Sequence, residues 1–406
     1  MSNTDAINNK ILNILIPSLS RDFRSALALI GDDEWDYMLV RAREHRFLPL
    51  MHWTLEQADV LNKVPHKAEK AIADARRRST LRALAAQREI LLVHRLFADA
   101  DIPHVFLKGA YLSQFAYPHP GLRPVRDIDV VVAPDCVSRA FTLMAKQGYV
   151  PITDTPVDVE AYVKQSKHLP GLLNPSGSLS VEVHSHVDAP GGKLARLDAL
   201  QNVTIRYMGN DPVPFMDPTD QFIYLCVHAA DFHTFNNGPL IIADIGFLLQ
   251  RGEIDLYHVA SRATELGVMK SVTLTLALTD SCWHVSRNDT EVLFDPIPED
   301  VIQDVRQLCF RSFAARSYVT LVAELSGEGL TSPGAVRIIQ EIFPSPTKLV
   351  LEFGPSQSPA EYIPRLMRHW GRLATEKLPA IFASRSQQTT QAEISRVKRI
   401  RTYLQP

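Results

Sequence analysis

Two aspartates stand one residue apart in the stretch RDIDVVV at residues 126–132. Residues two apart in a strand point to the same face, so Asp127 and Asp129 are expected side by side. Adjacent carboxylates repel each other and need a cation or solvent between them. One interpretation is a solvated strand end, or pairing with Arg123 and Arg126. The other is a divalent metal site, because Mg²⁺ prefers carboxylate oxygens and keeps substrate phosphates among its ligands.

Three further features favour the metal site. Lys108-Gly109 follows an apolar stretch and precedes a helical one; glycine there lets backbone N–H groups approach phosphate, and lysine adds positive charge. A third acid, Glu182, lies in the alternating stretch SVEVH, which can carry it to the same site. Arg123 precedes the aspartates, within reach of a polyphosphate. His184 is expected to face the same way as Glu182 and to touch substrate or orient that acid, unless it is a structural histidine.

Several short elements must bring these residues together. Short apolar or alternating runs predict strands, and helical periodicity predicts the helices between them. A Pro- and Gly-rich loop precedes the aspartates. The expected elements are strands at 102–107, 127–133 and 178–184, helices at 110–116 and 136–147 with Gly148 as a C-cap, and a hairpin at 203–207 and 213–216. Together they predict a small α/β or α+β unit.

Helical sequence flanks this unit on both sides. Apolar residues recur at helical spacing over 33–44 and 66–99 before it, and over 218–235, 239–251 and 255–285 after it. The composition changes near residues 101 and 217, and more loosely around 326–345. We therefore predict four parts: an N-terminal helical region at 1–100, the α/β core at 101–217, a helical domain at 218–330 and a C-terminal helical extension at 331–406.

The composition is that of an ordinary globular protein. The 406 residues are 46% hydrophobic and 22% charged, with a formal net charge of −2. This balance argues against a long nucleic acid as the partner. The four cysteines lie far apart without a C-x-x-C spacing, which argues against a zinc site or a disulfide framework. The apolar stretch at 11–16 is too short for a signal peptide or a membrane span, so a cytoplasmic protein without a membrane partner is expected.

The stretch FLKGAYLSQFAYPHPGLRPVRDIDVVV resembles one family in particular. Its pattern L-K-G…Y-x-x-P-G-x-R…D-I-D is similar to that of the uncharacterised bacterial nucleotidyltransferases, a branch of the DNA polymerase β-type superfamily. The stretches HRFLPL, SVEVHSHV, LCVHAA and FPSP extend the resemblance over most of the chain. It implies an α+β fold, with a small mixed-sheet core flanked by N-terminal and C-terminal helical regions.

The resemblance also implies a reaction. A nucleoside monophosphate would pass from an NTP, ATP by default, to a hydroxyl, phosphate or other nucleophile of a small-molecule, peptide or protein acceptor, with release of pyrophosphate. The cofactor would be Mg²⁺ or Mn²⁺, with two ions stabilising the entering and leaving oxygens. The residues implied are Asp127, Asp129 and Glu182 as catalytic metal ligands, and Lys108, Gly109, Arg123, Arg126 and His184 as nucleotide-binding residues.

Two departures keep an alternative open. Ala110 stands where the wider superfamily often has a serine that donates to phosphate, and Lys108 is expected to compensate. Arg126 is placed to pair with Asp127 and compete with a metal ion. The alternative is therefore a catalytically inactive nucleotide-binding or scaffold protein of the same fold. The presence of all three acids together with Lys108 and Gly109 favours the enzyme.

A second polar set lies in the helical region after residue 218. His228, Asp231 and His233 form H-x-x-D-x-H, and Asp244 follows. Such a segment could bind a metal if it bends, but a solvated or capped helix end is the favoured interpretation. His45, in HRFLPL, is expected to be structural.

Overall fold

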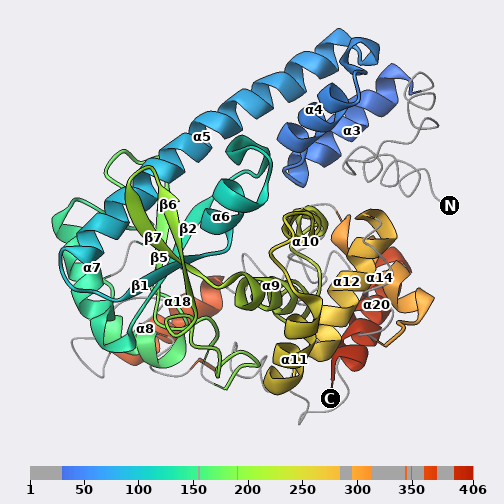
Figure 1. Cartoon of the computed structure of the whole chain (residues 1–406). Helices are drawn as coiled ribbons and strands as arrows, with labels where there is room; N and C mark the ends of the chain where they lie inside the picture. The colour runs from blue at the N-terminus through green and yellow to red at the C-terminus, as the bar shows by residue number, and fades with distance from the viewer. Residues whose placement is uncertain are drawn as a thin grey trace.

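The structure is a computed structural model that describes residues 30–153, 156–189, 191–283, 295–311, 343–344, 349, 361–372 and 388–405. Within these residues, helices flank a seven-stranded mixed sheet (Figure 1). The predicted α+β class with a small mixed-sheet core and flanking helical regions is confirmed. The division into four parts stays a prediction, and most of the expected C-terminal extension at 331–406 lies outside the described residues, as does most of the boundary at 326–345.

The sheet has the order β3-β4-β5-β2-β1-β7-β6. β2 pairs antiparallel with β1 and parallel with β5, while β1 pairs parallel with β7. The apolar residues of β1 and β2 are buried because these strands lie in the middle of the sheet, covered on both faces. The strands are β1 (His104–Leu107), β2 (Asp127–Val132), β3 (Val150–Pro151), β4 (Leu172–Leu173), β5 (Ser180–His184), β6 (Val203–Met208) and β7 (Asp211–Met216). All the predicted strands are thus confirmed, including the hairpin of β6 and β7.

A tight turn links β1 to the first helical segment of the core. The predicted helix at 110–116 is a three-residue α-helix, α6 (Gly109–Tyr111), followed by a π-helical turn at Leu112–Ala116. Lys108 opens the turn with φ +51°, a conformation that side chains rarely adopt. Its backbone N–H donates to Gln221 Oε1 at 3.0 Å, which ties the turn to the helical domain. Strain held in this way is typical of functional sites.

One long helix joins the N-terminal region to the sheet. α5 runs from a helix pair at its N-terminal end down to the sheet (Figure 1). Gly121 packs directly under it: a Cβ on Gly121 would lie 2.2 Å from Thr80 Oγ1, so only glycine admits this approach. The helices in this half are α3 (Asp32–Glu44), α4 (Leu48–Gln57), α5 (His66–Ala98), α7 (Val137–Lys146) and α8 (Val159–Gln165). The predicted helices at 33–44, 66–99 and 136–147 are confirmed, and Gly148 has the positive φ expected of a C-cap.

Further helices follow the sheet in the chain. They are α9 (Pro218–Val227), α10 (Leu240–Gln250), α11 (Leu256–Leu266), α12 (Met269–Trp283), α14 (Glu299–Cys309), α18 (Tyr362–Arg372) and α20 (Gln388–Leu404). The helical pattern at 255–285 is divided between α11 and α12, because Gly267 adopts the left-handed conformation, with φ +72°, that ends a helix. No helix in the described ranges is long and apolar enough to cross a membrane.

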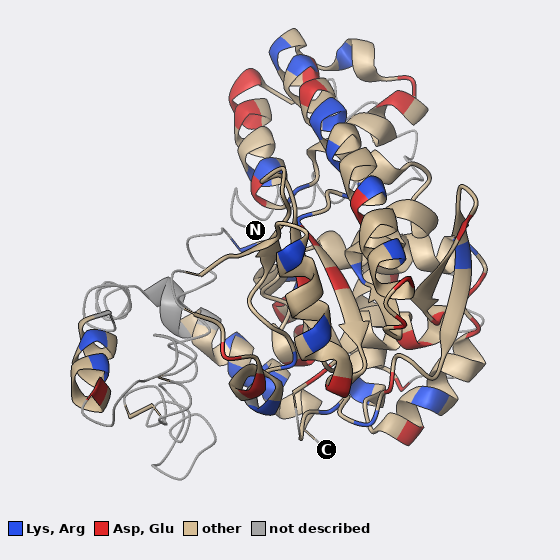
Figure 2. Cartoon of the chain, turned by 90° about the vertical axis from the view of Figure 1, so that its left-hand side faces the viewer, with Lys and Arg blue, Asp and Glu red and all other residues tan. Residues whose placement is uncertain are grey.

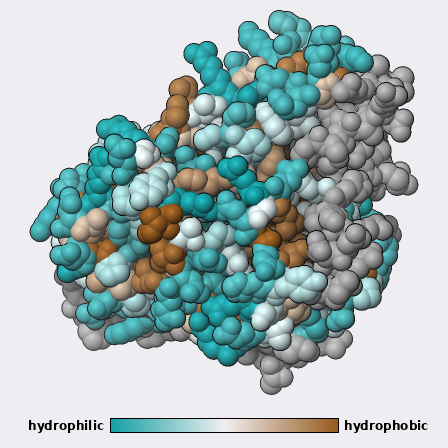
Figure 3. Space-filling model, in the orientation of Figure 1, coloured by the Kyte–Doolittle hydropathy of each residue, from teal (hydrophilic) through white to brown (hydrophobic). Residues whose placement is uncertain are grey.

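The surface is mainly polar. Basic and acidic residues are interspersed over the helices on the side shown in Figure 2. Brown apolar patches interrupt the largely hydrophilic face in Figure 3. Exposed apolar side chains include Val203 and Ile205 on the edge strand β6. This mixed distribution agrees with the near-neutral net charge of −2.

Candidate active site

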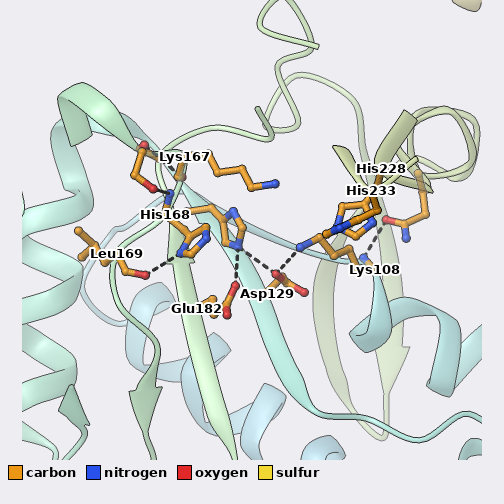
Figure 4. Close-up of polar contacts among 12 residues, drawn as sticks. Lys108, Asp129, Lys167, His168, Leu169, Glu182, His228 and His233 are labelled. Carbon is orange, nitrogen blue, oxygen red and sulfur yellow. Dashed lines mark hydrogen bonds and ion pairs between the residues drawn. The ribbon is translucent and has the colours of Figure 1, made fainter. Parts of the chain in front are cut away.

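A cleft of about 890 Å³ lies where three parts of the chain meet. The connection between α3 and α4 contributes Arg46 to it. The sheet and the turn after β1 contribute the three acids and Lys108, and the helical segments after the sheet contribute His228 and Asp244. Figure 4 shows how the residues near Asp129 point toward one another.

The pairing of β2 with β5 places the acids. Asp127 is opposite Ser180, and Asp129 is opposite Glu182. Ile128 is fully buried, as expected if its neighbours on either side point to the other face. Asp127, Asp129 and Glu182 all line the cleft, as the sequence predicted for a common site.

Asp129 is held in the ionised form by two partners. Its side chain is almost fully buried, and Oδ1 accepts from Lys108 Nζ at 2.6 Å and from His184 Nε2 at 2.9 Å. Burial alone would raise the pKa of Asp129, but Lys108 and His184 outweigh it and hold the pKa well below its usual range. Burial would likewise lower the pKa of Lys108, but the attraction of Asp129 raises it.

The other two acids differ in their partners. Burial would raise the pKa of Glu182, but a hydrogen bond from His184, whose Nε2 lies 3.5 Å from Glu182 Oε2, lowers it. The ligand atoms of Asp129, Glu182 and His184 lie within 4.8 Å of one another. Asp127 stands outside this close group and forms no hydrogen bond or ion pair through its side chain within the described ranges. Burial, and repulsion from Asp129 and Glu182, raise the pKa of Asp127.

One end of the cleft is rich in arginine. Arg123 donates from Nε and Nη2 to the two oxygens of Asp244, at 3.0 and 3.1 Å. Its third nitrogen, Nη1, lies against Gly109, where a Cβ would come within 2.7 Å of it. The glycine predicted to admit a phosphate therefore also admits this guanidinium group. Arg126 is exposed at the same end and forms no ion pair with Asp127, in contrast to one of the sequence interpretations.

Arg46 also lines this end, although no feature of the sequence singled it out. Arg46 has φ +65°, and burial together with the charges of Arg123 and Arg126 lowers its pKa to about 10. The adjacent His45, which is expected to be structural, is buried, and its ring packs edge-on against Phe310 at a centroid distance of 5.7 Å. The HRFLPL match was the one available signal, but it does not show which residue faces the cleft.

The other end holds a lysine and several histidines. Lys167 and His168 line it from the segment before β5, and no motif had pointed to them. His228 and His233 line it from the helical side, with their Nε2 atoms 3.3 Å apart. His233 is exposed at the C-cap of this segment, as a solvated or capped helix end predicts, while His228 is only partly exposed.

A π-helical turn at His228–Phe232 directly precedes His233. Its i→i+5 hydrogen bonding makes it wider than an α-helical turn, so that His228 and His233, which would point apart on an α-helix, come to the same side. Asp231 points elsewhere and pairs with Lys193 Nζ at 2.6 Å. Asp244 is likewise engaged, by Arg123 and by the hydroxyl of Tyr117 at 2.7 Å.

Comparison with known proteins assigns the family. The family model described as an uncharacterised nucleotidyltransferase matches residues 31–284. This range includes both walls of the cleft and every residue that lines it. Comparisons with curated proteins and with solved structures find no match. In agreement with the resemblance seen in the L-K-G and D-I-D motifs, the chain belongs to the family of uncharacterised nucleotidyltransferases.

Proposed function

We propose that this protein is a Mg²⁺- or Mn²⁺-dependent enzyme that transfers a nucleoside monophosphate from an NTP to a nucleophilic acceptor and releases pyrophosphate. The observation that carries the proposal is the register of β2 and β5. It sets Glu182 beside Asp129, with Asp127 two residues earlier on the same face, in the cleft of a chain from a nucleotidyltransferase family.

The three acids fit a divalent cation. Repulsion from Asp129 and Glu182 contributes to the raised pKa of Asp127, after burial, and a cation among these carboxylates would relieve it. Every contact of the described residues with the Asp129 carboxylate uses Oδ1, so Oδ2 remains for a ligand role. Carboxylate oxygens are the donors that Mg²⁺ prefers. A cation held there supplies charge neutralisation at the phosphates and a lower pKa for the attacking hydroxyl.

The arginine end of the cleft suits the triphosphate. Arg46, Arg123 and Arg126 bring three guanidinium groups to it. Guanidinium groups can match phosphate oxygens in pairs, while Arg123, whose Nε and Nη2 bind Asp244, offers Nη1 alone. Asp244 holds Arg123 in one orientation, with Nη1 toward Gly109. A donor fixed in advance in this way stabilises the charge that develops on the leaving pyrophosphate.

The acceptor belongs on the side of Glu182. His184 contacts both Glu182 and Asp129, which fixes the orientation of the Glu182 carboxylate. Its lowered pKa keeps Glu182 ionised, which suits it to hold a cation that would lower the pKa of the attacking hydroxyl. His184 acts here as a positioning residue.

Thermal unfolding with ATP, GTP, CTP and UTP, each with and without Mg²⁺, tests the proposal. A ligand at a hundredfold excess over Kd stabilises the native state by about 2.7 kcal/mol. The test variant is Asp127→Asn, since Asp129→Ala would also leave Lys108 buried without its partner. Asp74→Asn, at an exposed position of α5, is the matched control.

A Mg²⁺-dependent shift with one nucleotide, lost in Asp127→Asn and kept in Asp74→Asn, supports the enzyme and names the donor. Pyrophosphate release then serves to screen acceptors. Nucleotide binding that is equal in both variants and independent of metal would favour the inactive nucleotide-binding protein. The absence of any shift would favour the scaffold.

A further inference from the structure

The end of the cleft opposite the arginines is also cationic. Lys167 reaches across it toward His228 and His233, with Lys108 below (Figure 4). Its Nζ lies 4.5 Å from the centroid of the Phe232 ring. No carboxylate pairs with this ammonium group among the residues that the structure describes.

Backbone contacts fix the place of Lys167. Its carbonyl oxygen accepts from the N–H of Ser185 at 2.9 Å, and the next residue, His168, forms an antiparallel bridge with His184. Burial, and the charge of Lys108, lower the pKa of Lys167 to about 8. Lys167 is therefore held beside β5 rather than free on the surface, and no carboxylate of the described residues forms an ion pair with it.

The histidines complete this end with neutral donors. Burial lowers the pKa of His228 well below its usual range and lowers that of His233, and the nearby lysines add to both effects. A neutral imidazole carries one N–H; because His228 and His233 meet through their Nε2 atoms, one N–H is used within the pair and the other can donate to an anion. A bound cation, in contrast, would meet the positive charges of Lys108 and Lys167.

The two cationic ends are separate. β2 and β5 run parallel, with Asp127 opposite Ser180 and Asp129 opposite Glu182. Arg126 directly precedes the start of β2, whereas Lys167 is hydrogen-bonded to Ser185, just after the end of β5. The arginines therefore adjoin the Asp127 end of the two strands and Lys167 adjoins the other end, beyond Glu182.

We propose that Lys167, His228 and His233 bind a phosphate group of the acceptor, so that the acceptor substrate is a phosphorylated compound. The identification as acceptor rests on the proposed function, which assigns the donor triphosphate to the arginines and the acceptor to the side of Glu182. A phosphate monoester carries a charge close to −2 at pH 7 and three acceptor oxygens. Donors that approach from two walls of the cleft match such a group.

Thermal unfolding with inorganic phosphate as the probe tests this, with ionic strength held constant by chloride. The titration is run with and without a saturating non-hydrolysable analogue of the nucleotide that binds. The variants are Lys167→Gln and His233→Gln, and the control is Lys164→Gln, which removes an exposed lysine three residues away. Phosphate should stabilise wild type and Lys164→Gln equally, whether or not the analogue is bound.

Lys167→Gln should weaken phosphate binding about tenfold or more, the usual loss for a hydrogen bond to a charged group, and should leave the Kd of the analogue unchanged. His233→Gln, at an exposed position, should weaken phosphate binding less. A phosphate effect that disappears when the analogue is bound would overturn the proposal, because the lysine end would then hold the donor's phosphates. Equal phosphate binding in Lys167→Gln and wild type would overturn it as well.

If no nucleotide binds but phosphate binding still depends on Lys167, the phosphate site is upheld and the proposed transferase activity fails. Different results would therefore refute the phosphate site and the proposed transferase activity.

Discussion

Two buried aspartates line the cleft, Asp129 from the sheet wall and Asp244 from the helical wall. They are 2% and 3% exposed, and each pairs with a cationic side chain. Asp244 uses both oxygens, on two nitrogens of Arg123 and the hydroxyl of Tyr117. The contacts found for Asp129 all use one oxygen. The two carboxylates are equally buried but differ in what they can bind. Of the two, only Asp129 has an oxygen, Oδ2, that forms no hydrogen bond or ion pair with the described residues and is left for a ligand.

Asp127 extends this comparison. It stands on the sheet wall near Asp129, is only partly buried, and has a raised pKa without a side-chain partner in the described ranges. The helical wall thus holds a satisfied ion pair, whereas the sheet wall holds negative charge in excess. We expect substitutions on the helical wall to change the free energy of unfolding and substitutions on the sheet wall to change the rate of the reaction.

The largest effect is expected for Asp244→Asn. This variant leaves the guanidinium group of Arg123 buried without its counter-ion, and breaking a buried pair costs about 3–5 kcal/mol. The free energy of unfolding in a denaturant titration should fall by that amount. Asp36→Asn, which breaks an exposed pair with Lys67, should cost no more than about 1 kcal/mol. Similar losses in the two variants would contradict the structural role of Asp244.

Asp127→Asn should have the opposite effect: the reaction rate should fall while the free energy of unfolding does not. Removing one of three neighbouring carboxylates relieves repulsion, so the free energy of unfolding should be equal to that of wild type or slightly higher. The rate of pyrophosphate release should fall at least a hundredfold, roughly 2.7 kcal/mol in the barrier. A destabilised variant with normal turnover would contradict the assignment of Asp127 to the reaction, because Asp127 would then serve stability instead.

Gly109→Ala tests whether Asp244, on the helical wall, holds Arg123 against the turn after β1. The added methyl would meet Arg123 Nη1 at 2.7 Å while Asp244 holds the other two nitrogens in place. Overpacking of this kind costs about 1–3 kcal/mol of stability. In the Asp244→Asn background the guanidinium group is free to move, so the added cost of the methyl should shrink. Additive costs in this double-mutant cycle would show that Asp244 does not fix Arg123.

The smallest effect expected is a pH dependence at Lys167. Because its pKa is lowered from 10.5 to about 8, the folded protein releases this proton before the unfolded chain does. The free energy of unfolding of wild type should therefore rise relative to Lys167→Gln as the pH increases from 8 to 10.5. Allowing for partial exposure, we expect a rise on the order of 1 kcal/mol. Parallel stability curves for the two proteins would exclude an unpaired, buried charge at this end of the cleft.

Much of the fold could be predicted because its signals are local. Alternation with period two identified β5 and its neighbours, and helical spacing identified α3 and α5. The division at Gly267 was missed, because the apolar pattern continues on both sides of it. The π-helical turn at 228–232 was missed because its sequence is also compatible with a regular helix.

The residues of the candidate site likewise fall into those that local sequence patterns indicate and those that they do not. Asp127, Asp129 and Lys108 were found because strand periodicity and a turn motif determine where such side chains point. Arg46 and Lys167 were missed because each reaches the cleft from a segment whose direction is set by packing against other parts of the chain.

By itself, the sequence determined the family, the strands and the placing of two aspartates on one face with a lysine-glycine turn before them. These follow from the backbone geometry of neighbouring residues. Only the tertiary structure decided which carboxylates are neutralised, that Arg123 is bound to Asp244, and that cationic side chains lie at both ends of the cleft. Ion pairs and burial depend on side chains brought together from distant parts of the chain, and a local sequence pattern does not show which of these side chains meet.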